Sequence, residues 1–408
     1  MDVQEKSPGH PKGWARAEAA LSKVRRNGTP WFWRRLGEEW RQPTTPPGRA
    51  FKRAVVRGGG SVLMAASAVP RLMGSGRGHV TLFYDLEVSP ITYDFAWALV
   101  GAEKLRRERG LDFIRVVVVP GRHGGLRHEE PAYEAVVDAE ARKFRVQHIV
   151  LALCRALPSV HGVHLCSTRM EATVACALAR GPVLPQGYWP AFPSAHDPAD
   201  ILRAPERSES VPLALRATEA ALRQVRPWLA HVAGGRRPVT ITLREYAFMP
   251  QRNSNIEAWI AFAERLDAAA YAPIFVRDTE AALGPIPERM ARHVLMPEAS
   301  WNLELRLALY ELCYLNLMVN NGPHGLCMFN GAARYMMFKI LTPSVPQTTE
   351  AYMRSLGFTI GAQPAFARPW HRWVWEDDSL DVIEREFARM CRDIDGAVAS
   401  GALRAPVL

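Results

Sequence analysis

LNLMVNNGPHGLCMFNGAARYMMFKI, residues 315–340, places a polar turn between two apolar runs. LNLMV at 315–319 and RYMMFKI at 334–340 are short and nearly continuous in apolar residues, which is typical of strands buried on both faces. Between them, NNGPHG starts where the first run ends, and a short helix is expected after it. A strand, a turn, a helix and a strand form the unit of a parallel sheet, so the stretch predicts an α/β fold.

The same order of elements recurs on the amino-terminal side of this stretch. Apolar runs rich in Val, Ile and Phe alternate with helical patterns, which is the pattern of a parallel sheet with crossover helices. The predicted strands lie at 79–84, 113–120 and 162–167, and then at 239–243, 272–278, 293–297, 314–319 and 334–340. These form two groups, separated by the Pro-rich segment 181–200.

A chain of 408 residues with 48% hydrophobic residues is too long for one ordinary core. We therefore predict two tandem Rossmann-like, doubly wound α/β domains after an amino-terminal extension. The predicted segments are a basic extension at 1–78, an acceptor domain at 79–200, a linker and bridging helix at 201–237, and a donor-binding domain at 238–408. Neither group of strands carries the G-x-G-x-x-G of dinucleotide enzymes, so we expect no nicotinamide or flavin cofactor.

The extension carries the charge of the chain. Residues 1–78 hold 15 Lys and Arg against 5 Asp and Glu, which accounts for the entire net charge of +10. Its tryptophans and arginines favour contact with an anionic membrane surface. Nonspecific attraction to nucleic acid and packing of the tryptophans on the folded body are the alternatives, and we expect no specific nucleic-acid partner.

The six cysteines are scattered and show no framework spacing. This pattern predicts reduced thiols in a cytoplasmic protein. No apolar run reaches membrane-spanning length, so we expect any membrane contact to be peripheral, at the inner membrane face and through the extension.

The polar turn has the features of an anion site. In open α/β sheets the ligand crevice lies at the carboxyl ends of the strands, where NNGPHG stands. Free N–H groups at a helix start attract phosphate, and Gly322 would let the anion approach the backbone. The alternative is an ordinary Asn-Gly-Pro turn.

Two stretches carry a resemblance to a known family. ASWNLELRLALYELCYLNLMVNNGPHGLCMFNGAARYMMFKILTPSVPQ at 299–347 and VTITLREYAFMPQRNSNIEAWIAFAERLDAAAYAPIFV at 239–276 resemble the carboxy-terminal half of heptosyltransferase-like, family 9-type glycosyltransferases of GT-B fold. Asn320 and Asn321 stand where that family has an acidic residue and a serine, so the resemblance does not name the donor.

The resemblance implies a set of donor-binding residues. Asn321, Gly322, Pro323 and His324 match the donor-binding turn, and Arg252 matches a basic residue near the donor diphosphate. Arg244 could share that role, and Thr342 lies in a loop that would close over the donor. Guanidinium groups suit this chemistry because they stabilise the negative charge on the departing diphosphate. The alternatives are a solvated loop for the arginines, a backbone-bonded helix-start residue for His324, and a plain connector around Thr342.

The first domain should supply the general base. The loop DLEVSPITYD after the first strand offers Asp85, Glu87 and Asp94 as catalytic candidates. Asp85 has the weak additional support that the family carries an aspartate a few residues before a proline, although a helix-cap or turn role is the alternative. The loop PGRHGGLRHEEP at 120–131 is a candidate for acceptor recognition, and its spacing does not fit a metal site, so we expect no metal.

Together these features predict a glycosyltransferase that moves a sugar from a nucleotide-sugar donor to a cell-envelope or surface glycan, including a lipid-linked acceptor. A nucleotide-sugar epimerase-like enzyme and a catalytically inactive scaffold with the same fold remain the alternatives. The oligomeric state and the identity of the sugar are not encoded in any pattern found here.

Overall fold

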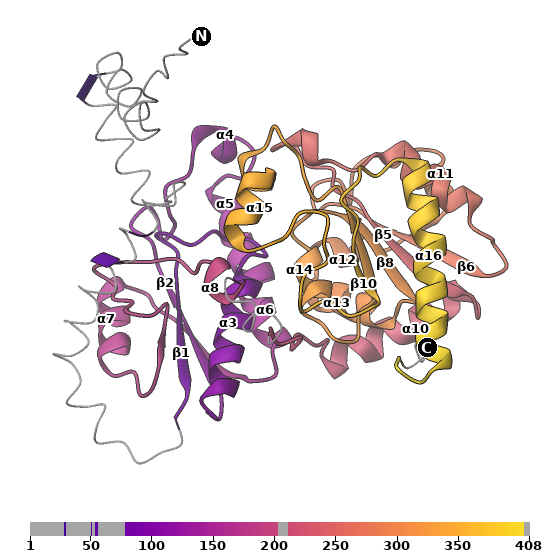
Figure 1. Cartoon of the computed structure of the whole chain (residues 1–408). Coiled ribbons are helices and arrows are strands. Elements are labelled where there is room, and N and C mark those ends of the chain that lie inside the picture. The colour runs from indigo at the N-terminus through magenta and orange to yellow at the C-terminus, as the bar shows by residue number, and fades with distance from the viewer. Residues whose placement is uncertain (1–27, 30–49, 51–53, 56–77, 203–210, 404–408) are drawn as a thin grey trace, which may run out of the picture. The chain divides into compact units, whose positions relative to one another are not determined.

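The computed structural model describes residues 28–29, 50, 54–55, 78–202 and 211–403. The chain forms two compact units, Met1–Gly59 and Gly60–Leu408. The structure described below is that of the second unit, which contains two parallel sheets (Figure 1). The extension at 1–78 lies almost entirely outside the described residues.

The first sheet has four parallel strands in the order β3-β2-β1-β4. The central strands β1 and β2 are largely apolar, and every residue of β1 is buried, as expected for a parallel sheet covered on both faces. The edge strand β3 alternates half-buried and exposed residues. The strands and helices of this half are β1 (Val80–Asp85), α3 (Phe95–Glu108), β2 (Ile114–Val119), α4 (Pro131–Glu134), α5 (Ala139–Arg145), the π-helix η2 (Val146–Leu151), α6 (Ala152–Ala156), β3 (Val160–Leu165), α7 (Arg169–Ala177), β4 (Val183–Leu184) and α8 (Ala199–Leu202).

The second sheet has six parallel strands in the order β10-β9-β8-β5-β6-β7. Its elements are α10 (Glu219–Ala233), β5 (Arg237–Thr242), η3 (Pro250–Arg252), α11 (Ile256–Arg265), β6 (Tyr271–Val276), η4 (Met290–Arg292), β7 (Val294–Leu295), α12 (Glu298–Trp301), α13 (Leu303–Leu312), β8 (Leu315–Val319), α14 (His324–Met328), β9 (Tyr335–Phe338), η5 (Pro346–Thr348), α15 (Glu350–Leu356), β10 (His371–Trp373) and α16 (Leu380–Ala399). The sequence did not predict the two-residue β4 or the three-residue β10.

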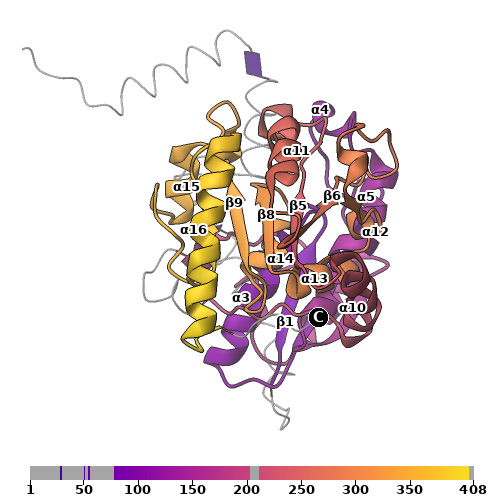
Figure 2. The same cartoon turned by 90° about the vertical axis from the view of Figure 1, so that its right-hand side faces the viewer.

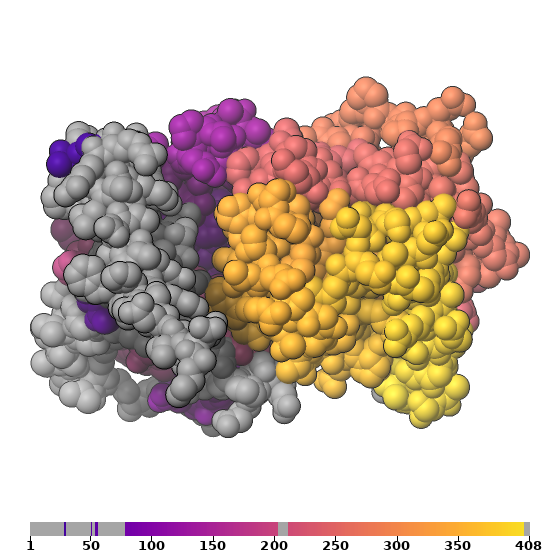
Figure 3. All heavy atoms as spheres, turned by 45° about the horizontal axis from the view of Figure 1, so that its top comes forward, coloured from indigo at the N-terminus to yellow at the C-terminus, as the bar shows by residue number. Residues whose placement is uncertain are grey.

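Helices cover both faces of each sheet. In the first half, α3 and α6 pack on one face and α7 on the other. In the second, α11 and α16 share one face, seen in front of the sheet in Figure 2, while α10 and α13 pack on the opposite face. Figure 3 shows α16, in yellow, directly against the orange segments that precede it. The predicted fold class, two doubly wound α/β halves, is therefore confirmed.

The two halves share one apolar core. A single cluster of buried side chains includes residues of α3 and β2 together with residues of α13, α14 and β9. The partly buried ring of Trp97 packs against this cluster and meets the Phe329 ring edge to face, with centroids 4.7 Å apart. The predicted domain boundaries at 200 and 238 stay predictions.

No helix within the described ranges is both long enough and apolar enough to cross a bilayer.

Candidate functional site

The strand order of the second sheet fixes where a ligand crevice can form. β5 and β8 are neighbours, and the chain winds outward from them in opposite directions. Such a switch of direction opens a crevice at the carboxyl ends of the two strands. Arg244 follows β5 there and Asn320 follows β8, and the Arg252 guanidinium joins the two loops by donating to the Asn320 carbonyl at 3.0 Å.

A loop from the first half closes against this crevice. The segment that enters α3 carries Tyr93 and Asp94, and a β-carbon added to Gly322 would lie 2.7 Å from Cδ2 of Tyr93. The loop after β1 and the loop after β8 are therefore in direct contact. Gly322 is required by this close approach, because any larger residue would have to displace the tyrosine ring.

Asp94 is brought together with two of the predicted donor residues. Burial lowers the pKa of Arg252, and the nearby Asp94 carboxylate opposes that shift. Burial also lowers the pKa of His324, and the positive charge of Arg252 lowers it further. The Asp94 carboxylate opposes this shift too. Asp94 itself is exposed and accepts a hydrogen bond from Thr92 Oγ1 at 2.9 Å. A solvent-facing carboxylate thus lies within electrostatic range of a half-buried guanidinium and a half-buried imidazole.

One hydrogen-bond donor of the Arg252 guanidinium has no partner among the described residues. This donor is Nε, which is buried. Buried donors in native proteins are almost always paired, so an unpaired one beside a crevice is an opening for a ligand oxygen. Arg252 is therefore the predicted donor residue with the best geometric support.

The turn after β8 binds its own backbone. Asn321 Oδ1 accepts from the His324 N–H at 3.2 Å, and the N–H groups of Gly325 and Leu326 donate to the carbonyls of Gly322 and Pro323. The free N–H groups expected from the sequence are therefore already satisfied in this conformation. The Asn321 carbonyl accepts from Nδ1 of His324, which leaves Nε2 as the unprotonated nitrogen.

Arg244 organises the loop between β5 and α11. It is buried and donates to the carbonyls of Phe248 and Met249 at 2.7 and 3.0 Å, and to Oδ1 of Asn253. Burial, followed by the charge of Arg252, lowers the pKa of Arg244 to about 10. Its hydrogen bonds hold the loop that carries Arg252, so its place in the structure is to position that residue.

Asp85 forms a buried ion pair with Arg169. Its fully buried carboxylate accepts two hydrogen bonds from Arg169, at 2.8 and 2.9 Å, and one from the Tyr188 hydroxyl at 2.6 Å. Glu87 accepts from the Arg122 N–H at 2.6 Å. The structure thus separates the three predicted carboxylates, and of these it brings Asp94 to Arg252 and His324.

Thr342 lies in a turn of its own. Its N–H donates to the Thr348 carbonyl at 3.1 Å, and its carbonyl accepts from the Thr348 hydroxyl at 3.2 Å. The turn is tied to the site through Asn320, whose side-chain amide donates to the Ile340 carbonyl at 3.0 Å. Thr342 therefore remains a predicted donor residue, placed one segment away from the turn after β8.

The sequence did not predict a second bridge between the halves. Arg145 of α5 donates to the hydroxyls of Tyr133 and Tyr246, both at 3.0 Å, and Tyr133 packs edge to face on Phe248. Tyr133 precedes Arg145 by 12 residues, and Tyr246 follows it by 101 residues. This bridge fixes the loop of Arg244 and Arg252 against the first half.

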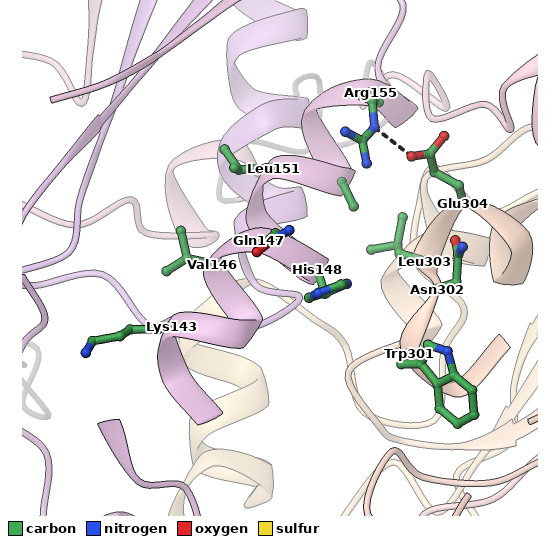
Figure 4. Close-up of a pocket in the computed structure, with 11 residues that line it drawn as sticks. Lys143, Val146, Gln147, His148, Leu151, Arg155, Trp301, Asn302, Leu303 and Glu304 are labelled. Carbon is green, nitrogen blue, oxygen red and sulfur yellow. Dashed lines mark hydrogen bonds and ion pairs between the residues drawn. The ribbon is translucent and has the colours of Figure 1, made fainter. Parts of the chain in front are cut away.

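A separate pocket of about 470 Å³ lies between α5, η2 and α6 of the first half and α12 and α13 of the second (Figure 4). The Arg155 guanidinium spans it to Glu304 at 2.6 Å. It contains none of the predicted site residues.

Comparisons with known proteins give only distant structural similarities. No family model matches the chain, and no curated protein matches it in sequence. Among solved structures, a glycosyl transferase family 9 protein from Veillonella parvula is 10% identical, with 78% of this chain and 97% of that chain covered and a TM-score of 0.46. An alpha,alpha-trehalose 6-phosphate synthase from Burkholderia multivorans is 10% identical, with 90% and 81% covered and a TM-score of 0.22. The first of these carries the family name that the sequence resemblance predicts.

Proposed function

We propose that this chain is a glycosyltransferase that moves a sugar from a nucleotide-sugar donor to a glycan acceptor. The observation that carries the proposal is the contact of the loop after β1 with the turn after β8, through Tyr93 and Gly322, which brings the neighbouring Asp94 within electrostatic range of Arg252 and His324. The sequence resemblance of residues 239–276 and 299–347 supports the same activity. A transferase needs a base for the acceptor and a cation for the leaving group, and this site has one of each.

Asp94 acts as the general base in this mechanism. Its exposed carboxylate takes the proton from an acceptor hydroxyl, and the oxygen attacks the anomeric carbon of the donor. A single displacement of this kind inverts the anomeric configuration. Asp85 is a weaker candidate, because the Arg169 pair would have to break before its carboxylate could accept a proton.

Arg252 acts on the leaving group. When the bond between the anomeric carbon and the diphosphate oxygen breaks, the electron pair stays on the diphosphate. A guanidinium whose buried Nε has no partner among the described residues is suited to stabilise this charge, since electrostatic interactions are stronger away from water. His324, with its Nε2 free to accept, is placed to hydrogen-bond a hydroxyl of the sugar or ribose.

The acceptor is proposed to be a cell-envelope or surface glycan precursor, and the basic residues of segment 1–78 to hold the enzyme at an anionic membrane. Each Lys or Arg near such a surface contributes about 1 kcal/mol. Replacing Arg25, Arg26, Arg34 and Arg35 with Ser should reduce sedimentation with phosphatidylglycerol vesicles. Equal sedimentation of this variant and the native protein would argue against a membrane role for the segment.

The experiment that tests the activity is a thermal-shift screen against UDP, GDP, ADP, CMP and their sugar conjugates, followed by an assay for nucleotide release. A ligand at a hundredfold excess over its dissociation constant stabilises the native state by about 2.7 kcal/mol. The shift should be lost in Arg252→Ala and partly kept in Arg252→Lys. Arg265→Ala is the matched control, because Arg265 is an exposed arginine on α11 that pairs with Glu384.

The proposal fails if no nucleotide or sugar nucleotide shifts the folded protein. It fails equally if Arg252→Ala and Arg265→Ala retain the same shift, because the ligand would then bind elsewhere.

A further inference from the structure

β3 and α7 bring three metal-ligating side chains together, away from the site described above. His164 lies in β3 and Cys166 follows the strand by one residue, with its N–H still bonded to the Val118 carbonyl. Residues two apart in an extended chain face the same side of a sheet. Both side chains therefore face α7, and Cys166 is buried among the residues packed beneath that helix.

The start of α7 supplies the third ligand. Thr168 caps the helix by accepting from the Glu171 N–H at 3.1 Å, and Glu171 Oε2 accepts from the Ser167 N–H at 2.6 Å. This reciprocal capping turns the carboxylate back toward the strand. Glu171 Oε1 accepts from Nε2 of His164 at 2.7 Å. The three ligand atoms of His164, Cys166 and Glu171 all lie within 4.8 Å of one another.

We propose that His164, Cys166 and Glu171 bind one Zn²⁺ ion. An imidazole nitrogen, a thiolate and a carboxylate oxygen are the ligand types that zinc prefers, at about 2.0–2.3 Å from the metal. With all three ligand atoms within 4.8 Å of one another, an ion can be placed between them once the hydrogen bond between His164 and Glu171 opens. His164 and Glu171 are 34% and 38% exposed, so an ion can enter from solvent and keep a water as its fourth ligand.

Cys166 keeps its proton when no ion is bound. Burial raises the pKa of the Cys166 thiol to about 11, and Glu171 raises it further, while Arg115 opposes the shift. A metal would displace the thiol proton, as zinc does at cysteine ligands generally. A thiolate and a carboxylate then neutralise the two charges of the ion. Asp85 also acts on this thiol, but its own charge is balanced by Arg169.

The ion would tie the end of an edge strand to the first turn of α7. That turn also carries Arg169, which holds Asp85 at the end of β1. Zinc bound here would therefore stabilise the first sheet near the Arg169–Asp85 ion pair. The expectation of no metal rests on the spacing within the 120–131 loop alone. H-x-C-x₄-E, the spacing of His164, Cys166 and Glu171, matches no common zinc motif.

Cobalt substitution tests the proposal on the full-length protein. After treatment with a chelator, titration with Co²⁺ alone should produce a near-ultraviolet thiolate-to-cobalt charge-transfer band that saturates at one equivalent and disappears when Zn²⁺ is added. Cys166→Ser should abolish the band. Cys176→Ser should keep it, because Cys176 is a buried cysteine of the same core cluster whose sulfur lies 3.6 Å from the Tyr188 carbonyl. His164→Gln should weaken binding by about tenfold or more.

A second readout guards against loss of folding. Zn²⁺ should raise the thermal midpoint of the native protein and of Cys176→Ser, and should leave that of Cys166→Ser unchanged, with circular dichroism showing that all three are folded. A folded native protein that gives no charge-transfer band overturns the proposal. So does a band that persists in Cys166→Ser, because another thiolate would then be the ligand.

Discussion

Gly322 and Tyr93 touch so closely that a β-carbon on the glycine would lie 2.7 Å from Cδ2 of the tyrosine ring. The two residues are far apart in the chain, one after β8 and one before α3. Their contact brings Asp94, the next residue after Tyr93, to Arg252 and His324. The position of the proposed base therefore depends on a glycine in the opposite loop.

Gly322→Ala should destabilise the protein by about 1–3 kcal/mol, because the added methyl group must displace the Tyr93 ring. Urea unfolding measures this change. Gly325→Ala is the control: its β-carbon would lie 3.8 Å from that of Ala96, an ordinary contact, and alanine is the better helix former in α14. In a Tyr93→Ala background the cost of Gly322→Ala should largely vanish. An unchanged cost in that background would contradict the packing explanation.

Asp94→Asn should lower the turnover rate by about 10²–10⁴-fold, since the amide cannot take the proton of the acceptor hydroxyl. Binding of the donor nucleotide and the thermal midpoint should change little, because Asp94 is exposed. Glu87→Gln is the matched carboxylate control and should keep most of the activity. Full activity of Asp94→Asn, measured as nucleotide release with acceptor present, would remove Asp94 from the mechanism.

Arg169→Ala should destabilise the protein by about 3–5 kcal/mol, because it leaves the fully buried Asp85 carboxylate without its cation. Denaturant unfolding near pH 7 measures the loss. The double variant Asp85→Asn, Arg169→Ala should be less destabilised than Arg169→Ala alone, since no charge then stays buried. A double variant that loses the sum of both single effects would show that the ion pair is not the cause.

Local patterns predicted the strands but not their partners. LNLMV and VTITL read as buried strands because apolar and β-branched residues fill them almost completely, and the structure places β8 and β5 there. The roles of Asp85 and Asp94 could not be distinguished in the same way. Arg169, which forms an ion pair with Asp85, lies 84 residues from it in the chain. Arg252, whose pKa is affected by Asp94, lies farther still from that residue. Only the topology of the two sheets decides that the Asp85 carboxylate is held in an ion pair and that the Asp94 carboxylate is exposed to solvent.

The turn after β8 shows a second limit of the sequence. Asn-Gly-Pro-His predicts an anion site if its N–H groups are free, and an ordinary turn if they are bonded within it. In this structure the Oδ1 of Asn321 accepts from the His324 N–H, so that N–H is bonded within the turn. Composition cannot reveal this hydrogen bond, because the same asparagine could equally have pointed toward a ligand.

The buried imidazole of His371 should make the protein sensitive to mild acid. Its Nε2–H donates to the Ala333 carbonyl at 3.0 Å, its Nδ1 has no partner among the described residues, and burial lowers its pKa to about 4. In the unfolded chain the pKa is about 6.5, so below that pH the unfolded state binds a proton that the folded state refuses. The contribution of His371 to stability is therefore complete above about pH 6.5 and falls by up to about 1.4 kcal/mol per pH unit down to about pH 4.

Glutamine can keep the donor to Ala333 without titrating. Between pH 7 and pH 4.5, His371→Gln should therefore lose about 2–3 kcal/mol less unfolding free energy than the native protein in urea unfolding. Parallel losses in the two proteins would assign the acid sensitivity to other groups.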